Sequence, residues 1–416
     1  MSLDSACCVS VSAGTGAHSR FRVSPRRGDF DWTPPPRGAA LVPSGQVTWA
    51  PRWRLPERAA SVAVCEAAAA AAAGARCGAG PGGRARGVLV PGRAHGRRSG
   101  AGAMVTEQEV EAIGRSLVDP QQPLQARFRA LFTLRGLGGP AAIAWISRAF
   151  DDDSALLKHE LAYCLGQLQD PRAVPVLVDV LRDTRQEPMV RHEAGEALGA
   201  IGSPEVLEVL KEFEADPVVE VAETCQLAVR RLEWLQQRGG APAPEGPYLS
   251  VDPAPPAEER DVGRLRAALL DEARPLFDRY RAMFALRDTG GEEAALALAE
   301  GLRCGSALFR HEVGYVLGQL QHEAAVPALV AALARRAESP MVRHECAEAL
   351  GAIARPACLA ALRAHAGDPE RVVRESCAVA LDLYAHESGA AFQYADGLER
   401  LRAPPPDPDP GPDPRV

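Results

Sequence analysis

The chain has 416 residues, of which 46% are hydrophobic and only 5% aromatic. The hydrophobic content is sufficient for a buried core and excludes disorder of the whole chain, while the few aromatic side chains argue against a β-sandwich or β-barrel. The formal net charge of −7 is uneven, because residues 1–103 contain 14 Arg, no Lys and 5 acidic residues, and the remainder has a balance of −16. An acidic body disfavours nucleic acid as the main ligand and suits a basic partner.

Cysteine usage and hydropathy indicate the compartment. The 10 Cys residues are scattered without CxxC pairs, and no N-terminal segment has the charged start, apolar core and small-residue cleavage site of a secretory signal. No apolar run approaches the roughly 20 residues that a membrane helix needs. We therefore expect reduced thiols, a cytoplasmic protein and no membrane partner.

The first segment, residues 1–103, has little periodicity and is interrupted by "TPPPRG" and "GAGPGG". The Gly-rich block follows no apolar strand and opens no helix, so it does not have the context of a phosphate-binding loop. We expect this segment to be disordered, or to be an extension that precedes a start at Met104.

From Met104 onward, helical patterns of about 10–15 residues alternate with short breaks such as "GLGGP", "QDPRAVP" and "TRQEPM". A longer Pro- and Gly-rich segment, residues 236–260, predicts a flexible linker between two helical halves. The halves are expected at 104–235 and 261–388, and residues 389–416 are expected to be a disordered Pro- and Asp-rich tail.

Self-comparison defines the architecture. The stretch "RFRALFTLR" at Arg127 recurs as "RYRAMFALR" at Arg279, and "HELAYCLGQLQ" at His159 recurs as "HEVGYVLGQLQ" at His311, both 152 residues later. A shorter period of 33 residues lies within each half. Such periods are typical of solenoids of helix pairs. We predict an all-α, HEAT-like α-solenoid of about eight helix pairs in two pseudo-symmetric halves.

A His-Glu pair occupies the same repeat position four times. Residues 33 apart lie side by side in a solenoid, so each half should present one cluster, and the two clusters should face each other across a cleft. Imidazole and carboxylate are ligands of zinc, manganese and non-haem iron, so two clusters imply two metal ions. Other repeats, such as "VVEVAETCQLAV", lack the His, which argues against a mere repeat consensus. The pairs are His159–Glu160, His192–Glu193, His311–Glu312 and His344–Glu345.

Two familiar metal motifs are absent from these segments. None has the second His of HExxH, which disfavours a metalloprotease, and none has the Glu-x-x-His spacing of di-iron helix bundles. Tyr163 and Tyr315 lie one helical turn after their His residues, either in the core or near the metal. A basic residue precedes each His, and it either faces solvent or pairs with a site carboxylate; the four are Lys158, Arg191, Arg310 and Arg343.

The quoted pairs, within "ALLKHELAYCLGQLQD" and "EPMVRHEAGEALGAIG", resemble the deoxyhypusine hydroxylase family from Met104 to about Ala385. That resemblance implies a di-iron monooxygenase that uses dioxygen to hydroxylate deoxyhypusine on eukaryotic translation initiation factor 5A, with two irons per chain and an unidentified electron donor. It implies as iron ligands His159, His192, Glu193, His311, His344 and Glu345. Glu160 and Glu312 are either further ligands or acceptors for the cationic amines of the substrate.

Two other interpretations share the same repeats. A non-catalytic HEAT scaffold would bind a protein partner on its concave face, with a structural metal or none. A HEAT-like chromophore lyase would share the helices but would not need four symmetric His-Glu pairs. The pairs therefore favour the metalloenzyme.

Overall fold

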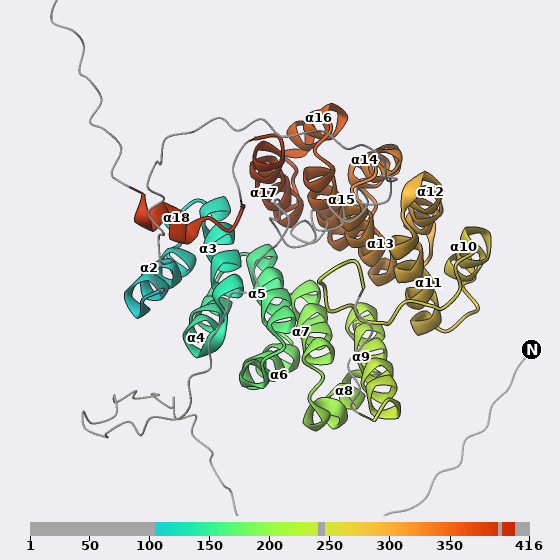
Figure 1. Cartoon of the computed structure of the whole chain (residues 1–416), viewed down its shortest axis with the longest axis horizontal. Coiled ribbons are helices and arrows are strands. Elements are labelled where there is room, and N and C mark those ends of the chain that lie inside the picture. The colour runs from blue at the N-terminus through green and yellow to red at the C-terminus, as the bar shows by residue number, and fades with distance from the viewer. Residues whose placement is uncertain (1–104, 240–245, 390–392, 404–416) are drawn as a thin grey trace, which may run out of the picture. The chain divides into compact units, whose positions relative to one another are not determined.

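The computed structural model describes residues 105–239, 246–389 and 393–403, which form paired helices (Figure 1). All of these residues belong to one compact unit of the chain. The predicted α-solenoid of eight helix pairs in two similar halves is confirmed for this part of the chain. The predicted disordered extension, residues 1–103, lies outside the described residues.

Each half contains four helix pairs. The helices of the first half are α2 (Glu107–Val118), α3 (Leu124–Leu137), α4 (Gly139–Arg148), α5 (Ala155–Leu168), α6 (Val174–Arg182), α7 (Pro188–Ile201), α8 (Leu207–Phe213) and α9 (Val219–Gln237). Those of the second half are α10 (Val262–Leu270), α11 (Leu276–Thr289), α12 (Gly291–Glu300), α13 (Ala307–Leu320), α14 (Val326–Ala334), α15 (Pro340–Ile353), α16 (Pro356–His365) and α17 (Arg371–Glu387).

Local sequence signals fix where the inner helices begin and end. Ser154 caps α5, because its side chain accepts a hydrogen bond from the Leu157 N–H, and Ser306 caps α13 in the same way. Gln169 ends α5 with a left-handed φ of 50°. Its side-chain amide then donates to Ala200 O in α7 at 3.0 Å, so the end of one inner helix is tied to the next.

Close helix packing depends on small residues. A Cβ atom on Gly166 of α5 would lie 2.7 Å from Ala197 Cα in α7, and one on Gly351 of α15 would lie 2.8 Å from Ala380 O in α17. Any larger residue at these two positions would push neighbouring helices apart. The glycines of the repeated Leu-Gly dipeptides therefore allow the close helix spacing that brings equivalent residues of adjacent repeats side by side.

The second helices of the pairs face each other across the two halves, whereas α6, α8, α12 and α14 lie on the outside (Figure 1). The halves meet at two seams: α9 contacts α11 and α13, and α17 contacts α3 and α5. Each seam carries an equivalent hydrogen bond, from Ser306 Oγ to Glu223 Oε2 at 2.6 Å and from Ser154 Oγ to Glu375 Oε2 at 2.7 Å. The caps of α5 and α13 are thus held by the opposite half.

The predicted flexible linker, residues 236–260, is ordered where it is described: its first two residues belong to α9, and the segment from Gly246 onward docks on the helices. Asp252 forms an ion pair with the buried Arg287 at 2.7 Å, and Ala254 is fully buried. Val251 N–H donates to Gln167 Oε1 at 2.8 Å, which attaches the segment to α5. The prediction was wrong for this part because the Pro-rich composition conceals side chains and backbone groups that dock on both halves.

The predicted tail, residues 389–416, also contains an ordered part. Helix α18 (Gly397–Arg402) follows Tyr394, whose side chain is buried beneath the Arg129 guanidinium at 4.2 Å from the ring centroid. Arg129 also pairs with Asp396 at 2.9 Å. Residues 393–403 of the predicted tail are therefore ordered, while residues 404–416, its Pro- and Asp-rich end, lie outside the described part of the chain. No helix within the described residues is long and apolar enough to cross a membrane.

Candidate metal centre

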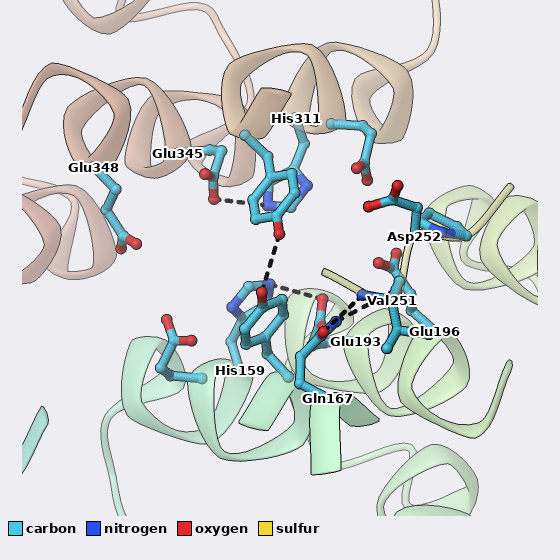
Figure 2. A pocket seen from close by; sticks show the side chains of 14 residues that line it. His159, Gln167, Glu193, Glu196, Val251, Asp252, His311, Glu345 and Glu348 are labelled. Atoms are coloured by element: carbon cyan, nitrogen blue, oxygen red, sulfur yellow. Dashed lines mark hydrogen bonds and ion pairs between the residues drawn. The ribbon is translucent and has the colours of Figure 1, made fainter. Parts of the chain in front are cut away.

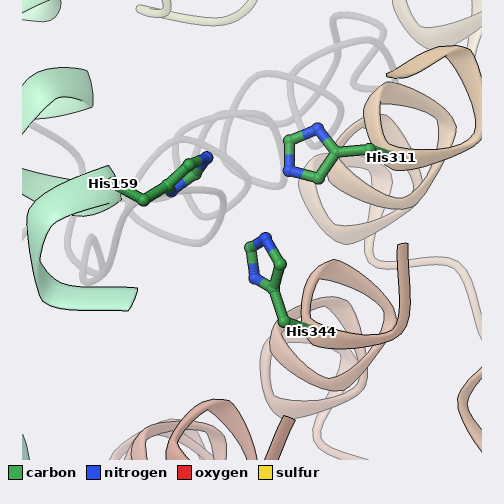
Figure 3. A group of neighbouring side chains, drawn as sticks. All are labelled: His159, His311 and His344. Carbon is green, nitrogen blue, oxygen red and sulfur yellow. The ribbon is translucent and has the colours of Figure 1, made fainter. Parts of the chain in front are cut away.

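Four imidazole rings meet between the two halves, one from each of α5, α7, α13 and α15. The ring centroids of His159 and His192 are 5.4 Å apart, and those of His311 and His344 are 5.2 Å apart. The two pairs also contact each other, since the His159 ring lies 5.2 Å from that of His344 and the His192 ring 5.4 Å from that of His311. Figure 3 shows three of these rings converging from opposite helices.

The prediction of two separate clusters facing each other across a cleft was therefore wrong in its geometry. The distances between rings of different halves equal those within one half, so the four imidazoles form a single cluster. The reason is that both seams are closed, which brings α5 and α7 directly against α13 and α15. Any ion bound here would lie between the halves.

Two carboxylates complete the cluster with the same two-fold relation. Glu193 Oε2 lies 3.2 Å from His159 Nε2, and Glu345 Oε2 lies 3.3 Å from His311 Nε2 (Figure 2). In each half, the Glu of the second inner helix thus reaches the His of the first. Adjacent positions on a helix differ by about 100°, which explains why Glu193 turns toward His159 while His192 points to the centre of the cluster.

Burial controls the charge state of these groups. Burial lowers the pKa of His159 to about 4 and lowers those of His192 and His344 well below the usual range. These imidazoles are therefore neutral at physiological pH, which is the form that binds metals. Burial also raises the pKa of Glu193 to about 8, because a charged carboxylate is poorly solvated there. A bound cation would reverse this effect by favouring the ionised carboxylate.

Many polar atoms of the cluster lack a partner within the described residues. Both ring nitrogens of His159, His311 and His344 have no hydrogen bond, and neither does Nε2 of His192 or Oε1 of Glu345. Buried polar atoms are normally paired, so a concentration of unpaired nitrogen and oxygen donors indicates a missing ligand. Donor atoms of three overlapping groups lie close enough to hold a metal ion; these groups are His159–His192–Glu193, His159–His311–His344 and His344–Glu345–Glu348. The residues therefore fit a metal centre.

The remaining two predicted site residues, Glu160 and Glu312, line the same cavity and are almost fully buried. The pKa of each is raised well above its usual range by burial and by neighbouring carboxylates. Neither belongs to the closely spaced metal-ligand groups of the described residues. Their position leaves room for a second role, as acceptors for a cation that is not the metal.

Sequence reasoning missed three further carboxylates of this cavity: Glu196, Glu348 and Asp252. Glu196 and Glu348 are related by the 152-residue shift and stand one helical turn after His192 and His344, so the repeated "HEAGE" and "HECAE" contained a usable signal. Asp252 comes from the segment that was expected to be flexible, and no spacing rule connects it to the helices.

Two tyrosines bridge the halves at the cavity. Tyr163 Oη and Tyr315 Oη are 3.0 Å apart, and Gln319 Nε2 donates to Tyr315 Oη at 3.1 Å. Both rings are buried and line the cavity. The structure therefore supports both predicted places for these tyrosines, because the two rings belong to the buried core and also line the cavity beside the metal centre.

The basic residues that precede the histidines neither face solvent nor pair with site carboxylates. Arg191 is buried and pairs with Asp216 at 2.6 Å, and Arg343 pairs with Asp368 at 2.5 Å. Lys158 and Arg310 likewise pair with acidic residues outside the site. Both predicted alternatives were wrong, because each basic side chain reaches the segment just before the next inner helix and pairs with an acidic residue there.

Comparison with known proteins agrees with this geometry. Models of HEAT repeats match residues 116–187, 143–230 and 295–382, and a PBS lyase HEAT-like repeat matches residues 278–304. The chain is 86% identical over 302 residues to the human protein named deoxyhypusine hydroxylase, an alignment that covers 73% of this chain and 100% of the relative. The chain belongs to the deoxyhypusine hydroxylase family. The bovine member is 85% identical over 301 residues, covering 72% of this chain and 99% of that member.

The family extends to distant animals and includes a solved structure. The fruit-fly member is 59% identical over 301 residues and covers 72% of this chain and 99% of that member. The structure of human deoxyhypusine hydroxylase in complex with glycerol matches with a TM-score of 0.67 and 86% identity, covering 67% of this chain and 97% of that one. Membership of an enzyme family disfavours the non-catalytic scaffold and the chromophore lyase.

Proposed function

We propose that this protein is an iron- and dioxygen-dependent monooxygenase that hydroxylates the deoxyhypusine side chain of eukaryotic translation initiation factor 5A, which completes the formation of hypusine. The single observation that carries the proposal is the buried cluster of four imidazoles and two carboxylates with unpaired donor atoms, in a chain of this family. A structural role alone would not require so many unpaired polar atoms between two helical halves.

We assign the metal ligands by the two-fold relation of the site. His159, His192 and Glu193 are proposed to hold one iron, and the equivalent residues His311, His344 and Glu345 are proposed to hold the other. Two imidazoles and one carboxylate per ion form a ligand set that suits non-haem iron and leaves coordination positions open. The contacts of Glu193 with His159 and of Glu345 with His311 support this grouping.

Hydroxylation of an unactivated C–H bond needs an oxidant that no side chain provides, and iron with dioxygen supplies that chemistry when bound. The protein contributes a buried cavity, which keeps bulk water away from the reacting carbon. The carboxylates Glu160 and Glu312 are proposed to bind the cationic amines of the substrate. If they were additional metal ligands instead, replacing them would lower the iron content. Replacing Glu160 by Gln should weaken substrate binding and leave the iron content unchanged.

The partner is expected to present a long cationic side chain to an acidic body. The balance of −16 outside residues 1–103 supports electrostatic steering of such a partner. An electron donor is expected as a further partner. We place the protein in the cytoplasm, because the described cysteines are free and buried rather than paired in disulfides.

Turnover tests the proposal directly. The full chain, loaded with ferrous iron under anaerobic conditions, is mixed with deoxyhypusine-bearing factor and air, and the factor is analysed by mass spectrometry. A gain of one oxygen atom on the modified lysine, dependent on both iron and dioxygen, is the expected result. An unmodified factor in the presence of full iron occupancy would contradict the proposed reaction.

A further inference from the structure

The two seams between the halves differ in how the chain connects them. At the α9–α11 seam, residues 238–261 run directly from one half to the other. At the second seam, α17 meets α3 and α5, which belong to a distant part of the chain (Figure 1). Only non-covalent contacts keep this second seam closed. The halves can therefore separate between α3 and α17 while the α9–α11 seam acts as a hinge.

A short segment that follows α17 crosses the second seam. We call residues 393–403, which include α18, the C-terminal strap. The Tyr394 ring of the strap is fully buried, with its centroid 6.0 Å from that of Phe132 in α3 and 5.7 Å from that of His386 in α17. Beyond this ring, α18 contacts α2 and α3. The strap thus attaches the end of the second half to the start of the first.

Arg129 of α3 couples the strap to the seam. Its half-buried guanidinium donates to both carboxylate oxygens of Asp382 in α17, at 2.8 and 3.0 Å. The same group donates to Asp396 Oδ2 of the strap at 2.9 Å and covers the Tyr394 ring. Undocking of the strap would expose the remaining Arg129–Asp382 pair to water, where ion pairs contribute little. The strap therefore strengthens the direct contact between the halves.

The 152-residue shift allows a comparison with the hinge seam. Arg281 of α11 is the equivalent of Arg129, but an arginine, Arg230 of α9, stands where α17 has its acidic partner. Arg281 Nε instead donates to Pro255 O at 3.3 Å, and Arg281 O accepts from the Ala257 N–H at 2.9 Å. The connecting segment thus docks on Arg281 as the strap docks on Arg129. At the unconnected seam, the strap and its ion pairs take the place of the covalent connection.

The strap is anchored weakly enough to be released. None of the six residues of α18 is fully buried, and its final contact is a partly exposed ion pair between Arg402 and Glu109 at 2.6 Å. Segments with few buried contacts open at a lower free energy than the core. Because Tyr394 is the one buried anchor among the described residues of the strap, undocking disturbs far less structure than unfolding of a helix pair would.

We infer that the C-terminal strap is a releasable latch, which holds the halves closed over the imidazole cluster when docked and lets the α3–α17 seam open for metal exchange when undocked. His192 and His344 are fully buried, so an ion that binds them reaches them through a movement of the surrounding structure. The metal exchange rests on the proposed function, whereas the opening of the seam is independent of it.

Deletions and a disulfide test the latch. One deletion removes residues 393–416, and a matched control deletion removes only residues 404–416. A third variant combines Thr133→Cys with Gly397→Cys. The Gly397 N–H donates to Thr133 Oγ1 at 3.0 Å, and a Cβ atom on Gly397 would lie 3.2 Å from Thr133 Cβ, close to the roughly 3.5–4.5 Å that a disulfide spans. Oxidation locks this strap on α3, and reduction frees it.

Two quantities are measured on each protein: amide hydrogen exchange in the iron-free state, and the rate at which a chelator removes iron from the iron-loaded state. The unmodified chain, treated with the same oxidant, controls for oxidation of the other cysteines. Without the strap, iron release should be roughly tenfold to a hundredfold faster, as for loss of hydrogen bonds to a charged group. Exchange should accelerate in α3 and α17 but not in α9 and α11. Deletion of residues 404–416 should change neither quantity.

The disulfide should slow both iron release and exchange relative to the reduced form, a comparison that holds even if the longer deletion prevents folding. Equal acceleration of exchange at both seams in the deletion variant would indicate a general loss of stability and overturn the latch. Identical iron release from the oxidised and reduced disulfide variants, with the bond verified by mass spectrometry, would also overturn it. A chain that binds no iron but shows the expected exchange pattern would refute the metal assignment while supporting the latch.

Discussion

A buried ion pair holds the first turn of the helix that carries His344. Arg343 is 2% exposed, its Nη2 lies 2.5 Å from Asp368 Oδ2, and its Nε donates to Leu333 O at 2.8 Å. Asp368 also accepts a hydrogen bond from the Glu370 N–H at 3.1 Å. The pair therefore joins α14, α15 and the turn before α17.

Replacing Asp368 by Ala should destabilise the protein by about 3 kcal/mol. Removing one partner of a buried pair typically costs about 3–5 kcal/mol, because the other charge stays buried without compensation. The lower end applies here, since the Arg343 guanidinium keeps its bond to Leu333 O. The measurement is urea-induced unfolding of the iron-free full chain, followed by far-UV circular dichroism. Iron binding should weaken as well, because Arg343 immediately precedes His344.

The chain contains its own control for this prediction. Cys304 stands where the equivalent repeat of the first half has Asp152, and Nη2 of the corresponding Arg279 has no hydrogen-bond partner in the described part of the chain. Arg279 is instead stacked on the Phe309 ring, 3.9 Å from its centroid. Cys304→Ala should therefore cost less than about 1.5 kcal/mol. An Asp368→Ala variant within about 1 kcal/mol of the unmodified protein would refute the role assigned to the buried pair.

Three further outcomes are expected. His192→Ala should lower the iron stoichiometry and abolish turnover while the helical circular dichroism remains; normal iron with full activity would contradict its assignment as a ligand. Glu223→Ala removes the 2.6 Å hydrogen bond that Ser306 donates across one seam. We expect about 1 kcal/mol of destabilisation and a faster release of iron, measured by chelator competition. An unchanged rate of iron release would contradict the role of the seam. The hydrogen bond from the Arg343 guanidinium lowers the pKa of Asp368 in the folded protein. The stabilisation by the Arg343–Asp368 pair is therefore fully present above the unfolded-state pKa of about 3.9 and is lost as pH falls through the lower folded-state pKa. Acid titration of the unmodified protein against Asp368→Ala should show this difference in slope, and parallel curves would contradict it.

The helices and their pairing follow from patterns that are local or periodic. The 33- and 152-residue shifts fix which residues are equivalent, and stacking of equivalent helices then brings His159 beside His192. The closure of the two halves does not follow from these shifts, because it depends on the two seams. This is why the sequence predicted two clusters and the structure has one.

Residues whose role depends on tertiary contacts could not be assigned from sequence. Arg191 was expected at the surface or in the site, but its partner Asp216 lies 25 positions later in a turn. The role of Asp252 depends on how the segment after Gly246 docks between the halves. Glu348 was visible as a repeated residue one turn after His344, yet only the structure shows that it lines the cavity of the site.

The central claim is that the imidazole cluster between the two halves holds two iron ions. Crystals of the anaerobically iron-loaded full chain allow anomalous difference maps to be collected above and below the iron absorption edge. The account predicts two peaks that appear only above the edge, one beside Glu193 and one beside Glu345, each within coordination distance of imidazole nitrogens. A peak that is unchanged across the iron edge, as zinc would give, or no peak within the cluster, would contradict the account.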